Sequence, residues 1–188
     1  MKGDVSVANA YLIHGTSTRD DDWFPWLEKA ARPSITVNRL AMPEAFAPHL
    51  DTWQHFLDQQ LPTEPGLTLV AHSLGCVTAI KFVQRHPELR NVNLVLVAPF
   101  DRPLKGSPSL DEFVKDPVDY QQVAPRLHKA VVITAKNDWI APFENAEQIA
   151  HGLGAKLIVN LMGGHYLAGD GFKEFPQVLD ELKWTLAD

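Results

Sequence analysis

The fold is decided by ten consecutive residues, Leu67-Thr68-Leu69-Val70-Ala71-His72-Ser73-Leu74-Gly75-Cys76. The first half, Leu67–Ala71, is an uncharged apolar run, which is typical of a parallel strand covered on both faces. The second half enters a segment, Gly75–His86, whose helical pattern stops before a proline. The stretch therefore predicts a buried strand, a tight turn at Ser73 and a helix that follows without a linker.

Five other apolar runs have the same strand-like character, and segments with helical signals separate them. The other strands are expected at Ala8–Ile13, Ile35–Leu40, Val92–Ala98, Ala130–Thr134 and Lys156–Leu161. The other helices are expected at Trp23–Ala31, His49–Leu61, Phe143–Gly152 and Phe172–Leu186. This alternation predicts an α/β fold in which helices cover both faces of a mostly parallel six-stranded sheet. Because 188 residues suit one domain and no linker or repeat is apparent, we expect residues 1–188 to form a single domain.

Composition and charge exclude several classes of function. Lysine and arginine number 17 against 23 acidic residues, so the net charge of −6 gives no reason to expect nucleic acid or an anionic membrane as a partner. No apolar run reaches the roughly 18 residues of a membrane span, and Met1-Lys2-Gly3-Asp4 leads into the first strand without a signal-peptide pattern. One cysteine, Cys76, excludes an internal disulfide. We therefore expect a soluble, cytoplasmic protein.

Metal and cofactor chemistry have little support in the sequence. The histidines lack the spacing of a zinc site, and a single cysteine cannot supply a thiolate cluster. No glycine-rich nucleotide fingerprint follows the first strand. We expect neither a metal nor a cofactor.

Ser73 has the strand–turn–helix context of a nucleophile elbow, in which a serine hydroxyl projects above the sheet. The residues two before and two after such a serine must be small, and here they are Ala71 and Gly75. Glycine is usual at both places, so Ala71 departs from the pattern by one methyl group. The alternative is a plain strand–helix turn in which Ser73 only caps the helix.

A serine needs a base and an acid, and enzymes with this elbow carry serine, acid and histidine in that order along the chain. Asp138 follows the fifth expected strand and His165 follows the sixth. The carboxyl ends of parallel strands share one edge of the sheet, so both side chains are expected near Ser73. Asp101, which follows the fourth strand, is the competing candidate for the acid. The alternative role for Asp101 is an exposed ion pair with Arg102.

The same site needs two N–H donors for the oxyanion of a tetrahedral intermediate. The main-chain N–H of Leu74 is one candidate, and that of Thr16, which Gly15 allows to come close, is the other. The alternative for His14-Gly15 is a simple turn that ends the strand. Cys76 is expected to be a buried small side chain and not a nucleophile, and His72 a pocket residue and not a second base.

Five motifs together resemble one known family. They are Leu12-Ile13-His14-Gly15, Trp23-Phe24-Pro25-Trp26-Leu27, Ala71-His72-Ser73-Leu74-Gly75-Cys76, Asn137-Asp138-Trp139-Ile140-Ala141-Pro142 and Gly163-Gly164-His165. The chain resembles the small serine hydrolases of the RBBP9/YdeN type over nearly its whole length. That resemblance implies a compact α/β-hydrolase fold with little or no cap, and Ser73, Asp138 and His165 as the catalytic triad.

These observations favour hydrolysis of a carboxylic ester, or of an amide or thioester, through an acyl-serine intermediate, with a small-molecule acyl substrate. The alternative is a hydrolase-fold module that binds another protein with little turnover, although no residue pattern indicates such a partner. A proline-containing insertion, Asp101–His128, has only a short helical pattern around Ser109–Lys115. It is expected to be a lid or a pocket wall, with Phe113 or Tyr120 bordering the acyl pocket.

Overall fold

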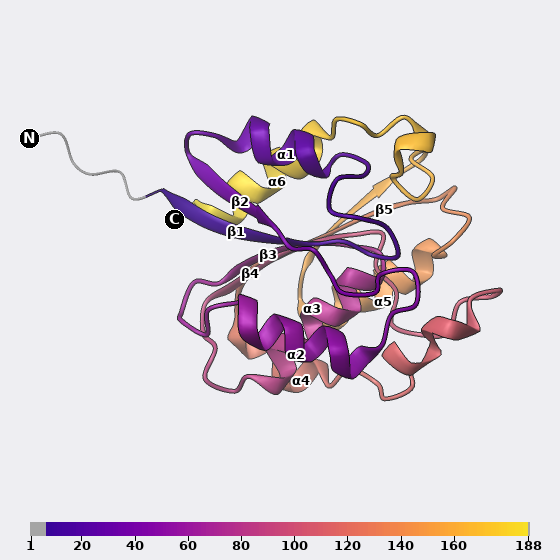
Figure 1. Cartoon of the computed structure of the whole chain (residues 1–188), viewed down its shortest axis with the longest axis horizontal. Coiled ribbons are helices and arrows are strands. Elements are labelled where there is room, and N and C mark those ends of the chain that lie inside the picture. The colour runs from indigo at the N-terminus through magenta and orange to yellow at the C-terminus, as the bar shows by residue number, and fades with distance from the viewer. Residues whose placement is uncertain (1–6, 188) are drawn as a thin grey trace, which may run out of the picture.

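The computed structural model describes residues 7–187. The segment Met1–Asp4, where the sequence analysis expects no signal peptide, lies outside the described residues. All neighbouring strands of the six-stranded sheet are parallel, in the order β2-β1-β3-β4-β5-β6 (Figure 1). The strands are β1 (Ala8–Ile13), β2 (Ile35–Arg39), β3 (Thr68–His72), β4 (Val92–Val97), β5 (Leu127–Ala135) and β6 (Lys156–Asn160). The chain moves outward from β1 to β2 and then returns to the other side of β1. The carboxyl ends of β1 and β3 therefore flank the switch point where ligands bind in such sheets.

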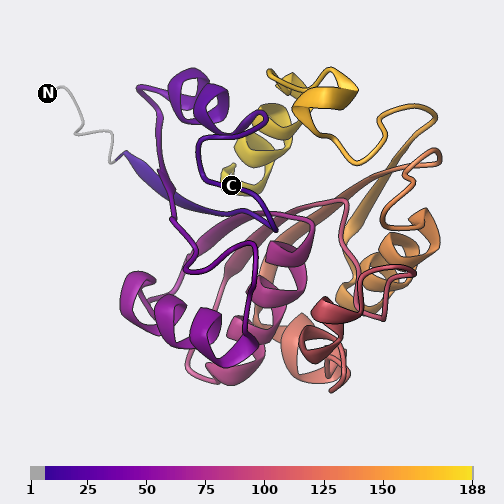
Figure 2. The same ribbon diagram turned by 45° about the vertical axis from the view of Figure 1, so that its right-hand side comes forward.

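Helices cover both faces of the sheet (Figures 1 and 2). One layer contains α1 (Phe24–Ala31) and α6 (Pro176–Leu186). The opposite layer contains α2 (Leu50–Gln60), α3 (Leu74–Arg85), α4 (Tyr120–Val123) and α5 (Phe143–Leu153). Two hydrophobic clusters result, because successive residues of a strand point to opposite faces: Leu69 and Ala71 of β3 belong to the α3 side, and Val70 belongs to the α1 and α6 side. The fold is the three-layer α/β arrangement that the sequence predicts.

Two boundaries differ from the expected ones by more than one residue. β5 begins at Leu127 instead of Ala130, and its first residue pairs with Val92 of β4. The last helix begins at Pro176 instead of Phe172. Phe172 and Phe175 instead pack in an aromatic cluster with Tyr166, with ring centroids 4.7–4.9 Å apart, and the proline then occupies the first turn, where its missing N–H is tolerated.

The insertion between β4 and β5 packs along α3 and carries 3₁₀ turns at Pro108–Phe113 and Ala124–Arg126. Lys81 donates to the carbonyl of Asp116 at 2.6 Å, and Gln84 accepts from the N–H of Asp119 at 2.8 Å. These contacts attach the insertion to α3, as a wall would require. None of the helices within residues 7–187 combines the length and the apolar character that crossing a membrane requires.

Candidate active site

Ser73 lies in a strained turn between β3 and α3. Its backbone has φ 55° and ψ −123°, a conformation that is unfavourable for any residue with a side chain. The start of α3 packs so closely on β1 that a Cβ at Gly75 would lie 2.3 Å from the carbonyl oxygen of Ile13. A Cβ at Gly15, in the loop after β1, would lie 3.0 Å from the Cβ of Ser73. Close main-chain packing therefore requires glycine at position 75 and leaves little room for a side chain at position 15.

The three residues of the expected triad form a continuous hydrogen-bonded chain. Ser73 Oγ lies 2.8 Å from His165 Nε2, and His165 Nδ1 lies 2.8 Å from Asp138 Oδ2. The side chains of His165 and Asp138 are only 3% and 0% exposed. Because an ionised carboxylate only accepts hydrogen bonds, Nδ1 carries the proton of the neutral imidazole and Nε2 accepts from the serine hydroxyl. This is the arrangement in which a histidine can remove a proton from serine.

Asp138 is oriented by the main chain of its own loop. Its Oδ1 accepts hydrogen bonds from the N–H groups of Ile140 and Ala141, both at 2.9 Å. Its own N–H donates to the carbonyl of Ala135, the last residue of β5, at 3.1 Å. Oδ2 therefore faces His165 from a fixed position.

The competing carboxylate, Asp101, is engaged elsewhere. Its Oδ2 accepts from the hydroxyl of Tyr120 at 2.7 Å, and its Oδ1 lies 3.3 Å from the guanidinium of Arg102. The ion pair with Arg102 that the sequence suggests is therefore present, with the Arg102 side chain 46% exposed and that of Asp101 11% exposed. Burial, and then the Asp101 carboxylate, raises the pKa of Tyr120, which therefore remains a donor. The structure thus brings Asp138, and not Asp101, to His165.

The loop at residues 163–168, hereafter the His165 loop, is held by side-chain acceptors from elsewhere. Its N–H groups donate from Gly163 and Gly164 to Asn137, from His165 and Leu167 to Asp170, and from Ala168 to Asp22, at 2.7–3.2 Å. Burial raises the pKa of Asp22. The sequence analysis did not find Asp22 or Asp170, because an aspartate in a loop has the same local pattern as an ordinary turn former.

The loop after β1 is shaped by His14. Its Nδ1 lies 2.8 Å from the carbonyl oxygen of Gly15, and its Nε2 accepts from the N–H of Met42 at 3.1 Å. Burial lowers the pKa of His14, which favours the neutral ring that these two bonds need. The segment His14-Gly15 is therefore more than a simple strand-ending turn. It places Gly15 against Ser73, with Leu74 N only 3.4 Å from a Cβ built at Gly15.

Two residues beside Ser73 lack the properties of a nucleophile or a second base. Cys76 is buried, its thiol contacts the carbonyl of Val97 at 3.4 Å, and burial raises its pKa, so the reactive thiolate is disfavoured. Burial lowers the pKa of His72 to about 3, which leaves it a very weak base near neutral pH. The structure agrees with both expectations.

A cavity of about 280 Å³ opens beside Ser73 and His165. Its remaining lining residues are Gly15, Thr16, Ser17, His72, Leu104, Ser107, Leu110, Trp139, Ile140 and Leu167. The insertion therefore borders the cavity, but through residues other than the expected aromatic ones. Phe113 is buried against Trp53, with centroids 5.4 Å apart, and Tyr120 packs against Gly152 of α5.

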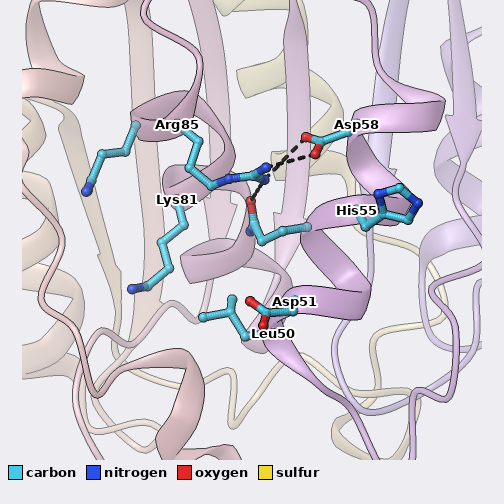
Figure 3. Close-up of a pocket in the computed structure, with 8 residues that line it drawn as sticks. Leu50, Asp51, His55, Asp58, Lys81 and Arg85 are labelled. Carbon is cyan, nitrogen blue, oxygen red and sulfur yellow. Dashed lines mark hydrogen bonds and ion pairs between the residues drawn. The ribbon is translucent and has the colours of Figure 1, made fainter.

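A second cavity of similar size lies between α2 and α3, away from Ser73 (Figure 3). Two of its charged side chains pair with each other, since Arg85 contacts Asp58 at 2.8 Å, and Arg85 also contacts Gln54 at 2.8 Å. Within the part of the chain that the structure describes, no serine and none of the expected catalytic residues lines it. The cavity at Ser73 is therefore the candidate active site.

Comparison with known proteins agrees with this geometry. The family model described as "Serine hydrolase" matches residues 10–184. The chain belongs to that family. It is 34% identical over 177 residues to the YdeN protein of Bacillus subtilis (strain 168), with 92% of this chain and 93% of YdeN covered. The resemblance to the YdeN type is thereby confirmed, and the chain is a hydrolase-family protein.

Solved structures give the same α/β-hydrolase fold. The crystal structure of the B. subtilis ydeN gene product has a TM-score of 0.88 at 30% identity, covering 97% of this chain and 100% of that chain. A YdeN-like hydrolase from Pectobacterium atrosepticum has a TM-score of 0.74 at 21% identity, covering 97% and 94%. Est1E from Butyrivibrio proteoclasticus with bound ferulic acid has a TM-score of 0.74 at 12% identity, covering 98% and 90%.

Proposed function

We propose that this serine hydrolase cleaves uncharged carboxylic esters through an acyl-serine intermediate. The observation that carries the proposal is the hydrogen-bonded chain from Ser73 through His165 to Asp138, with 2.8 Å at each link, at the side of an open cavity. Amides and thioesters contain the same kind of acyl carbon that Ser73 would attack. By leaving-group chemistry alone, an amide is a weaker candidate than an ester and a thioester is a stronger one.

The proposed reaction has two halves. In the first, His165 Nε2 takes the hydroxyl proton as Ser73 Oγ attacks the carbonyl carbon, and the N–H groups of Leu74 and Thr16 stabilise the oxyanion. His165 then gives that proton to the leaving alcohol, and the acyl group stays on Ser73. In the second half, His165 removes a proton from water, which attacks the acyl carbon, and Ser73 recovers its proton as the acid leaves. Asp138 stabilises the imidazolium in both halves.

The cavity supports an uncharged acyl group. Leu104 and Leu110 from the insertion face it together with Ile140 and Leu167, and among residues 7–187 no lysine, arginine, aspartate or glutamate lines it. A charged acyl group would lose hydration there without gaining an ion-pair partner from such a residue. Neutral aliphatic or aryl acyl esters are therefore the substrate class that these walls favour.

The test compares Ser73→Ala with Cys76→Ala. Ser73→Ala should lower turnover of p-nitrophenyl acetate on the order of 10⁴-fold or more and abolish labelling by a fluorophosphonate probe, since both need the serine oxygen. Cys76→Ala, a change at a neighbouring buried residue, should keep both. An unlabelled, inactive wild-type protein with native circular dichroism would instead favour a binding module. Activity that survives Ser73→Ala would refute the assignment.

A further inference from the structure

The residue before Ser73 contacts the main chain of the His165 loop. His72 ends β3, and its Nε2 lies 2.8 Å from the carbonyl oxygen of His165. The centroids of the two imidazole rings are 5.1 Å apart. Two adjacent residues, His72 and Ser73, therefore contact the backbone and the ring of the same histidine.

This contact determines which nitrogen of His72 carries the proton. A carbonyl oxygen only accepts hydrogen bonds, so Nε2 must donate and Nδ1 is unprotonated in the neutral ring. His72 is 2% exposed and lies against the rings of Trp23 and Phe24, at centroid distances of 6.1 and 5.7 Å. Burial, with His165 and His14 adding to its effect, lowers the pKa of His72 to about 3. The ring therefore stays neutral near neutral pH.

The turn that presents His165 depends on outside contacts. Its flanking residues, Gly164 and Tyr166, have φ 56° and 58°, and the N–H of Tyr166 donates to the carbonyl of Gly163 at 3.1 Å. A left-handed backbone is unfavourable for tyrosine, so such a turn persists where its surroundings hold it. Side-chain acceptors hold the other N–H groups of this loop, including that of His165, whereas His72 donates to the His165 carbonyl.

We propose that His72 is a positioning residue for His165: its Nε2–H holds the His165 carbonyl and so keeps the imidazole aligned between Ser73 and Asp138. This inference rests on the proposed function of those three residues. A neutral donor suits the position, because a cation 5.1 Å from His165 would oppose protonation of that base during the reaction.

Two substitutions of His72 separate the effect of its Nε2–H donor from the effect of its ring. His72→Phe keeps a planar ring of similar size without a donor, and His72→Gln places an amide N–H at about the reach of Nε2. Per active site counted by fluorophosphonate titration, His72→Phe should lower kcat by roughly 10- to 100-fold with KM within about twofold, since sub-ångström misplacement of a catalytic group costs on this scale. His72→Gln should recover most of the loss.

The matched control is Tyr166→Phe. It removes the 2.9 Å hydrogen bond between Tyr166 and Asn160 from the same loop but leaves the main chain of His165 untouched. We expect lower thermal stability and wild-type kcat per active site. Equal kcat in His72→Phe and wild type, or a loss that His72→Gln does not recover, would overturn the role of the Nε2–H donor.

The pH–rate profile distinguishes positioning from mere loss of folded protein. A His165 ring that is less well aligned with Asp138 has a less stable imidazolium, so the acid limb of kcat/KM should move to lower pH in His72→Phe. The limb should stay in place in His72→Gln and Tyr166→Phe. The titratable groups that face His72 are His165 and His14. An unmoved limb in His72→Phe would indicate that His72 only supports the fold.

A measurement without turnover separates this inference from the proposed function. Long-range ¹H–¹⁵N NMR correlations in the wild-type protein should show His72 protonated at Nε2, with no titration between about pH 6 and 9. An Nδ1-protonated or titrating His72 would overturn the inference even in an active enzyme. The expected tautomer in a protein that turns over no ester would overturn the proposed function instead.

Discussion

Two aspartates stand just past the ends of neighbouring strands, and the fold uses them differently. Asp101 follows β4 and Asp138 follows β5, each within a few residues of the strand end. Asp138 receives two main-chain N–H groups and faces His165, whereas Asp101 receives the hydroxyl of Tyr120 from the insertion. The comparison shows that residue type and position after a strand admit both aspartates, that the family resemblance favours Asp138, and that the contacts of the two loops agree with that preference.

The largest effect on kcat is expected from a substitution of Asp138. Asp138→Asn should lower kcat by roughly 10³–10⁴-fold, because a neutral amide no longer stabilises the imidazolium and favours the wrong imidazole tautomer. Asp101→Asn is the matched change, and it should stay within about tenfold of wild type. Steady-state kinetics on both variants, after circular dichroism has shown that they are folded, checks the ranking. The reverse ranking would move the acid to Asp101.

The insertion should control specificity and not the chemical step. Leu104 and Leu110 line the cavity, so replacing both by alanine should raise the relative kcat/KM for octanoyl over acetyl esters by about tenfold, the scale on which pocket volume discriminates. Ser109→Ala, at an exposed position in the same segment outside the cavity lining, is the control. The check is a series of p-nitrophenyl esters. The same acyl-chain preference in both variants would exclude the insertion from specificity.

A smaller effect is expected where Tyr120 holds Asp101. Tyr120→Phe removes one partly buried hydrogen bond and should cost about 1–2 kcal/mol of unfolding free energy, while kcat stays close to wild type. Urea denaturation at neutral pH measures the cost. A loss of kcat beyond about tenfold would show that the insertion positions the reacting groups as well as the pocket wall.

The same tyrosine gives the smallest expected effect, which is seen only at high pH. Burial and the nearby carboxylate raise the pKa of Tyr120 above its ordinary value near 10, so its proton is retained longer in the folded state than in the unfolded one. Stability is therefore complete below about pH 10 and declines as the pH rises above it. Urea denaturation between about pH 8 and 10.5 should show a steeper decline in wild type than in Tyr120→Phe. Parallel curves would contradict this assignment.

Most strands, and the loops that carry the proposed catalytic residues, could be predicted from the sequence. Buried parallel strands produce near-continuous apolar runs, and the run Ala8–Ile13 coincides with β1 at both ends. The Ser73 turn was also recognisable, because close packing there restricts neighbouring positions in the chain to small residues. The boundaries of β5 and α6 were less predictable. An extra pairing with β4 lengthens β5, and aromatic packing at Phe172 and Phe175 delays α6.

The aromatic residues of the insertion show why the pocket wall could not be predicted. Phe113 and Tyr120 are apolar enough to line an acyl cavity, but Phe113 fills space beside Trp53 and Tyr120 bonds to Asp101. Leu104 and Leu110 face the cavity instead. The direction of a side chain in an irregular segment depends on the surface it packs against, and periodicity carries no information about that surface.

The sequence by itself determined the strand–helix alternation, the tight serine turn and the order of serine, acid and histidine. These features depend on local patterns: apolar runs, small residues beside a turn, and polar residues just after strands. Only the tertiary structure showed that Tyr120 occupies Asp101, assigned Asp22 to the His165 loop and placed the proton of His72 on Nε2. The contact from Asp22 to Ala168 spans 146 positions and that from His72 to His165 spans 93. Such pairs meet only because parallel strands bring their carboxyl ends to one edge of the sheet.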